Sequence, residues 1–295
     1  MYLSDFKYHK PNTIAEALKI LKQSVNGLPI AGGTDLIVEA KKGLRKFTDL
    51  VSLAGLDELR IINEDANNIY IGAGVTHNGL VKSELLKQKL FALSEAASKI
   101  GSEQIRNTGT IGGNLCTAAS CADTAPILMA YNAQVELKSH KDARTIPLRD
   151  FFISHHKTDI KKNEIMTRII VQKQNQSTGA SFVKFGLREA SSISVASSAV
   201  LLQFDSGICK NASIVIGACA PTPVICENAN IITLGKAIDE LTEWDFLIEF
   251  IVSKVVNDTI PIDDIRGTAD YRRHLVKVLT KRAFALAIKR TNILK

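Results

Sequence analysis

Hydrophobic and polar positions in the first third of the chain recur with the periods of short helices and strands. Residues 12–23 place apolar side chains every three or four positions after an Asn or Thr start signal, which predicts an amphipathic helix. Residues 28–43 begin as a short apolar strand, run into Gly32–Gly33 and continue as a helix-like segment. Residues 47–55 predict another short strand.

The middle of the chain continues this mixture. Residues 59–74 predict two strands around an Asn67–Asn68 turn, and residues 80–100 carry apolar side chains at helical spacing. A buried helix suits residues 122–132. Strands are predicted at 133–139, 163–171 and 180–187, and the sequence HKDA turns the chain into RTIPL between the first two.

The pattern changes character after a polar stretch at 172–179. Strands at 193–204 and 212–218 follow, and two helices close the chain at about 236–257 and 268–290. A length of 295 residues exceeds the usual size of one compact domain. We therefore predict one domain at 1–175 and a second at 176–295.

The composition is that of an ordinary globular protein, with 45% hydrophobic and 23% charged residues. The longest apolar runs are too short and too rich in serine to span a bilayer, and the N-terminal residues lack the apolar stretch of a secretory signal. We expect a cytoplasmic chain without a membrane span.

A net charge of +7 could indicate a nucleic-acid partner. The lysines and arginines are scattered, however, and no nucleic-acid-binding signature accompanies them, so a solvated basic surface is favoured. The basic helix at 268–290 has an apolar stripe that fits a core at least as well as a membrane surface. A nucleic-acid-binding or assembly module without a redox cofactor stays a remote alternative.

Cysteine and histidine do not point to a metal site. The five cysteines form an odd set without paired C-x-x-C clusters, which argues against a disulfide framework and a structural zinc site. His155 and His156 are expected in a surface loop, because adjacent histidines point in different directions and no further ligand is nearby. No metal ligand and no catalytic residue are predicted. His77, and Thr76 beside it, are candidate contacts for a ligand.

Two glycine turns carry the candidate chemistry. Segments 29–36 and 108–115 each place a Gly-Gly pair after an apolar residue, next to hydroxyl or amide side chains. Successive N–H groups in such turns form a concavity that suits a phosphate or a diphosphate. Segment 105–114 is too polar for a core strand and too glycine-rich for a helix. Asp35 is expected to cap the following helix or to accept a ribose hydroxyl.

Each of these turns could also be a purely structural connection between two elements. For either turn alone this structural interpretation is favoured. The presence of two turns of the same polar kind makes a ligand-binding role more plausible without deciding between the two interpretations.

Three segments resemble the flavoprotein subunit of molybdenum-containing hydroxylases: residues 30–36, 104–128 and 216–224. The resemblance is strongest to the FAD-binding subunit of bacterial xanthine dehydrogenases. The resemblance extends over essentially the whole chain, including 260–275. It implies an α+β fold: a two-lobed FAD-binding domain of the PCMH type, with lobes at about 1–57 and 58–175. A smaller α+β domain like the C-terminal domain of the CO dehydrogenase flavoprotein would follow.

The resemblance also implies that FAD lies extended between the two lobes. Both glycine turns would contact its diphosphate, Asp123 would hold the adenosine part, and Lys184 would place a cation near the carbonyl end of the flavin. A solvated edge-strand lysine explains Lys184 equally well. The implied cofactor-binding residues are Pro29, Ile30, Ala31, Gly32, Gly33, Thr34, Asp35, Leu36, Thr76, Ile100, Gly101, Thr110, Ile111, Gly112, Gly113, Asn114, Asp123, Met166 and Lys184.

By this resemblance, the chain is expected to be the electron-transfer subunit of an oxidoreductase. A large subunit with a molybdenum cofactor would hydroxylate the substrate, and 2Fe–2S clusters in a small subunit would pass electrons to FAD and on to NAD⁺. Xanthine or purine oxidation in a dimer of heterotrimers is the expected context. Nicotinate, another N-heterocycle or carbon monoxide as substrate, and NADP⁺ or a quinone as acceptor, are the alternatives. No nucleic acid is expected as a partner.

Overall fold

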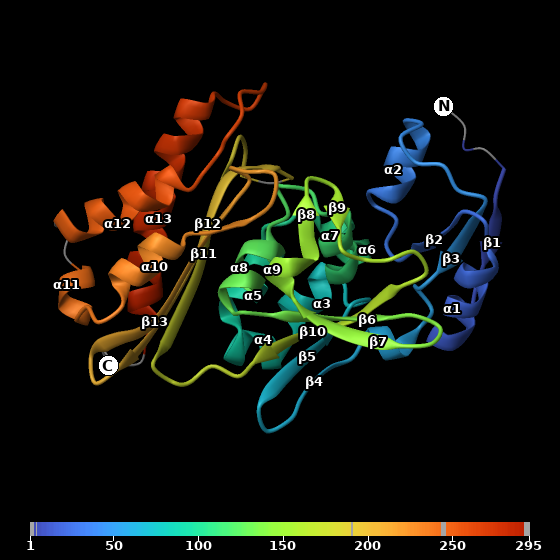
Figure 1. Ribbon diagram of the computed structural model, residues 1–295, viewed down its shortest axis with the longest axis horizontal. Coiled ribbons are helices and arrows are strands. Elements are labelled where there is room, and N and C mark those ends of the chain that lie inside the picture. The colour runs from blue at the N-terminus through green and yellow to red at the C-terminus, as the bar shows by residue number, and fades with distance from the viewer. Residues whose placement is uncertain (1–2, 4, 190, 243–245, 292–295) are drawn as a thin grey trace.

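The structure is a computed structural model that describes residues 3, 5–189, 191–242 and 246–291. From one end of the molecule to the other, it consists of a small N-terminal lobe, a larger second lobe and a C-terminal domain (Figure 1). Each of the three has its own β-sheet. Helices pack on largely antiparallel sheets in the second lobe and the C-terminal domain, which confirms the predicted α+β class.

The N-terminal lobe is a parallel three-stranded sheet with a helix packed on it. The strand order is β1 (Lys7–His9), β3 (Asp49–Ser52), β2 (Gly27–Ile30). Helix α1 (Ile14–Gln23) begins at its predicted start signal, because Thr13 Oγ1 accepts a hydrogen bond from the N–H of Glu16 at 3.1 Å. The edge strand β2 leads through the first glycine turn into the short helix α2 (Leu36–Lys41). A 3₁₀ turn, η1 (Asp57–Leu59), connects to the second lobe.

The second lobe is built on an antiparallel five-stranded sheet. Its strand order is β4 (Ile62–Glu64), β5 (Asn68–Gly72), β10 (Ile165–Gln172), β6 (Gln134–Lys138), β7 (Ala143–Pro147). The predicted turn between β4 and β5 is confirmed, and Asp65 Oδ1 accepts hydrogen bonds from the N–H groups of Asn67 and Asn68. Helix α9 (Leu148–Phe151) and a small hairpin of β8 (Phe152–Ser154) and β9 (Lys157–Thr158) follow β7.

The helices of the second lobe are shorter than the sequence pattern predicts. The helical run expected at 80–100 is divided into α3 (His77–Lys82), α4 (Glu84–Lys89) and α5 (Phe91–Ser98). The break after α3 has a local cause, since Ser83 Oγ accepts a hydrogen bond from the N–H of Leu86 and so starts a new helix. Helix α8 (Thr124–Ala130) is fully buried, as predicted.

The expectation that segment 105–114 avoids helical structure is wrong. Helix α6 (Glu103–Thr108) and helix α7 (Ile111–Thr117) cover most of it. The glycines persist in α7 for steric reasons: a Cβ on Gly112 would lie 2.6 Å from the Cβ of Ala73 and 2.7 Å from its carbonyl oxygen. Close packing of α7 against the segment that follows β5 therefore outweighs the low helix propensity of glycine.

The C-terminal domain is an antiparallel sheet with helices on its outer face (Figure 1). Its strands are β11 (Thr178–Gly186), β12 (Ser194–Asp205), β13 (Ile208–Gly217) and β14 (Val224–Ile225), and its helices are α10 (Glu227–Thr233), α11 (Ile238–Thr242), α12 (Phe246–Asn257) and α13 (Ala269–Lys289). The helix expected at 236–257 is represented by α11 and α12, and residues 243–245 lie outside the described residues. Helix α10 was not predicted. The closing helix is confirmed as α13.

The sheet of the C-terminal domain is covered on both faces. Val200, Leu202 and Phe204 of β12 belong to the core beneath α12 and α13, whereas Ala199 and Leu201 belong to the core of the second lobe, beside α5 and α8. This explains why β12 appears in the sequence as a continuous apolar run and not as an alternating one. No helix among the described residues is long and apolar enough to cross a membrane.

Candidate functional site

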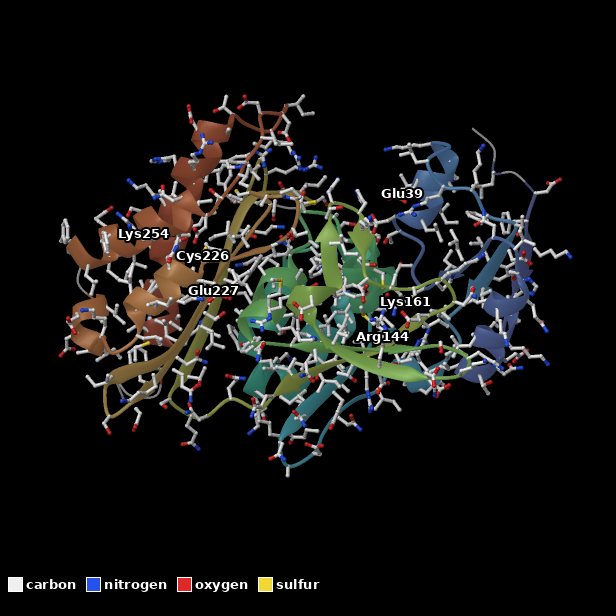
Figure 2. All side chains as sticks on the ribbon, in the orientation of Figure 1. Glu39, Arg144, Lys161, Cys226, Glu227 and Lys254 are labelled. Atoms are coloured by element: carbon white, nitrogen blue, oxygen red, sulfur yellow. The ribbon has the colours of Figure 1, made fainter. Side chains whose placement is uncertain are left out.

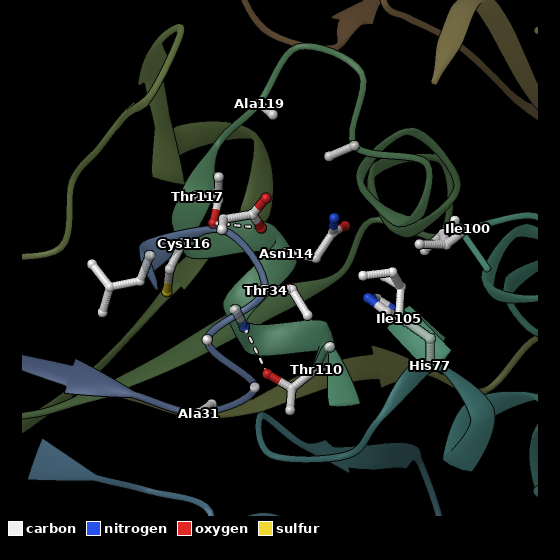
Figure 3. Close-up of a pocket in the computed structure, with 18 of the residues that line it drawn as sticks. Ala31, Thr34, His77, Ile100, Ile105, Thr110, Asn114, Cys116, Thr117 and Ala119 are labelled. Atoms are coloured by element: carbon white, nitrogen blue, oxygen red, sulfur yellow. Dashed lines mark hydrogen bonds between the residues drawn. The ribbon is translucent and has the colours of Figure 1, made fainter. Parts of the chain in front are cut away.

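A cavity of about 450 Å³ lies where all three parts of the molecule meet. Figure 3 shows this main cavity and the side chains that line it. The first glycine turn and the helices α6 and α7 form adjoining walls, and residues 191–193 of the C-terminal domain also line the cavity. The predicted site residues that line this cavity are Pro29, Ile30, Ala31, Gly32, Gly33, Thr34, Asp35, Leu36, Ile100, Gly101, Thr110, Gly113, Asn114 and Asp123.

The first glycine turn offers a row of free backbone N–H groups. No described residue accepts a hydrogen bond from the N–H groups of residues 31–35. The preceding strand, β2, lies at the edge of its sheet, and Pro29 within it has no N–H group. Gly33 adopts a left-handed backbone conformation, with φ +68°, that permits the turn. Unpaired, adjacent N–H groups on a cavity wall form the donor set that a diphosphate requires.

The two glycine turns are in direct contact. A Cβ on Gly32 would lie 2.1 Å from the carbonyl oxygen of Thr108 and 3.0 Å from the Cα of Gly109. Any side chain at Gly32 would therefore force the turns apart. Gly109 lies in the same region, because a Cβ there would approach Thr34 Oγ1 to 3.5 Å. Residues 76 positions apart in the sequence are thus joined at one wall of the cavity, as the pairing of the two motifs predicts.

The second glycine turn differs from the first in its backbone N–H groups. Ile111 and Gly112 donate theirs to the carbonyl oxygens of Val75 and Ala73, each at 2.9 Å. Gly113 donates to Thr110 Oγ1 at 3.1 Å, which caps α7 (Figure 3), and Asn114 donates to the carbonyl of Thr110. The expectation that this turn also presents a row of free N–H groups is wrong for residues 111–114; the N–H of Thr110 has no acceptor among the described residues. Most of the polar contribution of this turn to the cavity must therefore come from side chains.

Asn114 supplies one of these side chains. Its Oδ1 accepts a hydrogen bond from Thr124 Oγ1 at 2.7 Å, which fixes the orientation of the amide. The Nδ2 group has no acceptor among the described residues and is left to a ligand. Figure 3 shows the amide between the first turn and Ile100.

Asp123 and Lys184 form a buried ion pair at the end of the cavity. Their side chains are only 6% and 10% exposed, and Lys184 Nζ donates to Asp123 Oδ2 at 2.6 Å. Lys184 also donates to the carbonyl oxygens of Lys99 and Ser192, and Ser194 Oγ donates to Asp123 Oδ1 at 2.5 Å. A solvated edge-strand lysine is therefore excluded for Lys184. The pair neutralises both charges before any ligand binds.

Asp35 does not cap α2, contrary to one of the two roles expected of it. Its Oδ2 accepts a long hydrogen bond from Thr117 Oγ1 at 3.4 Å, across the cavity mouth from α7. Partial burial, together with the neighbouring Glu39, raises the pKa of the Asp35 carboxyl. Accepting a ribose hydroxyl stays a prediction.

The remaining predicted residues do not line the main cavity. Thr76 caps α3 by accepting from the N–H of Gly79, and Ile111 is fully buried in the core of the second lobe. Gly112 and Met166 line a second cavity of about 320 Å³. This second cavity is adjacent to the first, because the two share Leu28, Pro29, Ala31, Gly113 and Cys116 in their linings.

Arg106 and Asn107 have structural roles that the sequence left open. Arg106 donates to the carbonyl oxygens of Ile100 and Gly101 at 3.0 and 3.2 Å, and Asn78 Nδ2 donates to Asn107 Oδ1 at 2.6 Å. These bonds fix α6 against α3 and the Ile100–Gly101 turn. The only signal in the sequence was the density of polar residues beside the glycines.

Among the described residues, no three His, Cys, Asp or Glu side chains are grouped in a way that could hold a metal ion. His155 and His156 are exposed in the β8–β9 hairpin, as predicted. All five cysteines are free thiols. Burial raises the pKa of the Cys116 thiol to about 12, so it is protonated at neutral pH.

Comparison with known proteins decides the family. A family model described as an FAD binding domain in molybdopterin dehydrogenase matches residues 4–173, and one described as a CO dehydrogenase flavoprotein C-terminal domain matches residues 181–287. The chain is an FAD subunit of the molybdenum hydroxylase family.

Relatives of this FAD subunit belong to enzymes with different substrates. It is 29% identical to the xanthine dehydrogenase FAD-binding subunit of Escherichia coli O157:H7, with 95% of each chain covered. It is 32% identical to the nicotinate dehydrogenase FAD-subunit of Eubacterium barkeri, with 96% of each covered. Its fold matches a solved chain of carbon monoxide dehydrogenase from Hydrogenophaga pseudoflava with a TM-score of 0.93 and 29% identity, covering 99% of this chain and 100% of that one.

Proposed function

We propose that this chain carries FAD as the electron-transfer subunit of a heteromeric molybdenum hydroxylase. In this proposal, 2Fe–2S clusters of a small subunit deliver electrons to the FAD, and NAD⁺ is the acceptor. A large subunit holds the molybdenum cofactor and the substrate, which we propose to be xanthine or another purine. The assembly is a dimer of heterotrimers in the cytoplasm.

The observation that carries the proposal is the row of free N–H groups at residues 31–35, on the wall of an extended cavity. They supply several hydrogen-bond donors to a diphosphate without requiring a cation. The close contact of Gly32 with Thr108 holds the row in place. Because Lys184 already neutralises Asp123, the far end of the cavity does not repel an anionic cofactor.

The rest of the site fits the two ends of a dinucleotide. Asn114 Nδ2 is available to the ribityl or diphosphate region, and Ile100 and Gly101 offer an apolar surface and backbone groups beside a flavin ring. The adjoining cavity, which Met166 lines, has room for the other end of the cofactor. Bound FAD supplies the redox chemistry, and the residues of this chain bind it, orient it and limit its access to water.

The first test is flavin retention by the purified chain. Full-length chain incubated with FAD and then desalted is expected to keep a stoichiometric oxidised-flavin absorbance, and excess ADP is expected to displace it. A chain that folds but retains no flavin would refute the proposal at this level.

Substrate and acceptor need a second test, because the substrate-binding subunit is a different chain. Names of relatives support xanthine, nicotinate and carbon monoxide at similar identities. We expect the complex purified through this chain to oxidise xanthine with NAD⁺. A complex that is active only on nicotinate, another N-heterocycle or carbon monoxide, or only with NADP⁺ or a quinone, would replace these parts of the proposal and leave the FAD assignment intact.

A further inference from the structure

His77 is a buried histidine on the wall of the main cavity, at the junction of the two glycine turns (Figure 3). The residue is 3% exposed. Its backbone N–H donates to the carbonyl of Gly109 at 3.0 Å, and its ring carbon Cδ2 lies 3.3 Å from where a Cβ of Gly109 would be. Thr34 Oγ1 is 3.5 Å from the same point. The imidazole is therefore next to the row of free N–H groups.

The two ring nitrogens of His77 have different surroundings. Nδ1 is shut off from solvent and has no hydrogen-bond partner in the described structure. Nε2 also lacks a partner among the described residues, but it is not shut off in this way. Because His77 lines the cavity, Nε2 is the nitrogen that reaches it. A proton on Nδ1 would be a buried donor without an acceptor, so the neutral ring carries its proton on Nε2.

The ring stays neutral at physiological pH in the absence of a ligand. Burial lowers the pKa of His77 to about 4, and the Arg106 guanidinium on α6 acts in the same direction. The result is a rigid, uncharged N–H donor aimed into the cavity. A polar group this deeply buried requires a partner that the described residues do not provide.

We propose that His77 Nε2–H donates a hydrogen bond to the diphosphate of the FAD. The inference rests on the proposed function, and two observations carry it. The first four N–H groups of α7, those of residues 111–114, are occupied by Ala73, Val75 and Thr110, so the start of this helix gives the ligand no backbone donor, and within residues 109–114 only the N–H of Thr110 has no acceptor among the described residues. The second observation is the position of His77, whose backbone N–H is bonded to Gly109 and whose ring adds a side-chain donor beside the second turn. His77 belongs to the same segment, residues 73–77, whose carbonyl groups accept the N–H groups of Ile111 and Gly112.

Binding measurements on the full-length chain test the contact. His77→Phe keeps a ring of similar size but loses the donor, and we expect the dissociation constants of FAD and of ADP each to rise about tenfold or more, because a hydrogen bond to a charged group is lost. His77→Gln keeps an N–H donor near the position of Nε2, and we expect it to recover most of the affinity. His140→Phe, at an exposed histidine outside the cavity, is the control and should change neither constant.

A spectroscopic measurement on the unsubstituted chain makes the test independent of whether a variant folds. In chain labelled with ¹⁵N-histidine, FAD and ADP are expected to shift the Nε2 signal of His77 alone among the six histidines. The signal is assigned by its absence in His77→Gln. An Nε2 signal unmoved by either ligand would overturn the inference.

Other outcomes separate the inference from the proposed function. Wild-type chain that binds no FAD refutes the proposed function itself. FAD binding that is unchanged in a folded His77→Phe variant refutes only the role of His77. A loss of FAD affinity with unchanged ADP affinity moves the contact to the flavin or ribityl part and overturns the diphosphate assignment. An equal loss in the Phe and Gln variants shows a role in packing.

Discussion

At the scale of single residues, glycines of the two turns serve different purposes. Gly32 lets two turns that are distant in the sequence touch, whereas Gly112 lets a helix pack against Ala73. Gly33 alone needs its φ of +68°. Glycine therefore meets three different steric requirements in two similar motifs. The first turn keeps a row of backbone N–H groups for a ligand, whereas within residues 109–114 of the second turn only the N–H of Thr110 has no acceptor among the described residues.

Gly32→Ala tests the contact between the turns. The new Cβ would lie 2.1 Å from a backbone carbonyl, so one turn must move. We expect a loss of about 1–3 kcal/mol in the free energy of unfolding and a clear loss of FAD retention. Gly55→Ala is the matched control, because a Cβ there meets nothing within 4 Å. Denaturant unfolding and flavin absorbance of both variants check the result, and a Gly32→Ala chain with unchanged flavin retention would contradict it.

The same residues show what the sequence could and could not predict. The glycine pairs, Asn114 and Asp123 were recognised because the motif is local and specific. The loss of the N–H groups in the second turn was not predictable, because their acceptors, Ala73 and Val75, lie almost 40 positions earlier in the chain. The Asp123–Lys184 pair joins residues 61 positions apart and was missed for the same reason.

At the scale of elements, periodicity predicted long elements well and short ones poorly. Of the apolar stripe predicted for α13, Leu275, Leu279, Ala283 and Ile288 are buried, whereas Val278 and Leu286 are only half-buried. Val276, Phe284 and Ala287 are buried as well. Helices α6 and α7 were missed because intrinsic propensity favours a turn there and tertiary packing overrides it. Helix propensity is a weak guide wherever a helix has fewer than two turns.

The loop that follows β9 is held to β7 by a network of charges (Figure 2). Arg144 donates to Glu164 Oε2 at 2.8 Å and to Asp159 Oδ2 at 2.6 Å, and it thereby fixes residues 160–166 on the wall of the second cavity. Hydrogen bonds from Arg144 hold the pKa of both carboxyls below their usual range. The contribution of the network to stability is therefore expected to depend on pH.

Arg144→Met tests the network through the pH dependence of stability. Carboxyls with lowered pKa in the folded state contribute stability above their unfolded pKa of about 4, and this contribution is lost as the pH falls through the folded values. We expect the variant to have a lower urea midpoint than wild type at pH 7, with a difference that shrinks below about pH 4. Arg149→Met, at an exposed arginine, is the control. A difference that does not depend on pH would contradict the prediction.

At the scale of the whole molecule, the C-terminal domain contributes to the main cavity. Residues 191–193 line the main cavity, and Lys184 and Ser194 hold Asp123 at its end. Arg290, near the end of α13, reaches back to Glu95 of α5 at 2.9 Å. The family model that matches residues 4–173 alone thus does not include every residue that shapes the site.

Asp123→Asn tests the contact between the second lobe and the C-terminal domain, which the Asp123–Lys184 ion pair helps to form. It leaves the buried ammonium of Lys184 without its charge partner, and we expect a loss of about 3–5 kcal/mol in the free energy of unfolding together with weaker FAD binding. The double variant Asp123→Asn/Lys184→Met removes both charges and is expected to regain part of the stability. Calorimetry of the three chains measures this, and a double variant less stable than Asp123→Asn would contradict the role of the pair.

The distance of 61 positions between Asp123 and Lys184 also bears on how the protein is made. Domains fold as units during synthesis, the N-terminal one first. Lys184 on β11 and Ser194 on β12 are made after the whole of the second lobe, so the partners that hold the Asp123 carboxyl are absent until these two strands have been synthesised and have docked. The end of the main cavity is thus completed by the part of the chain that is made last.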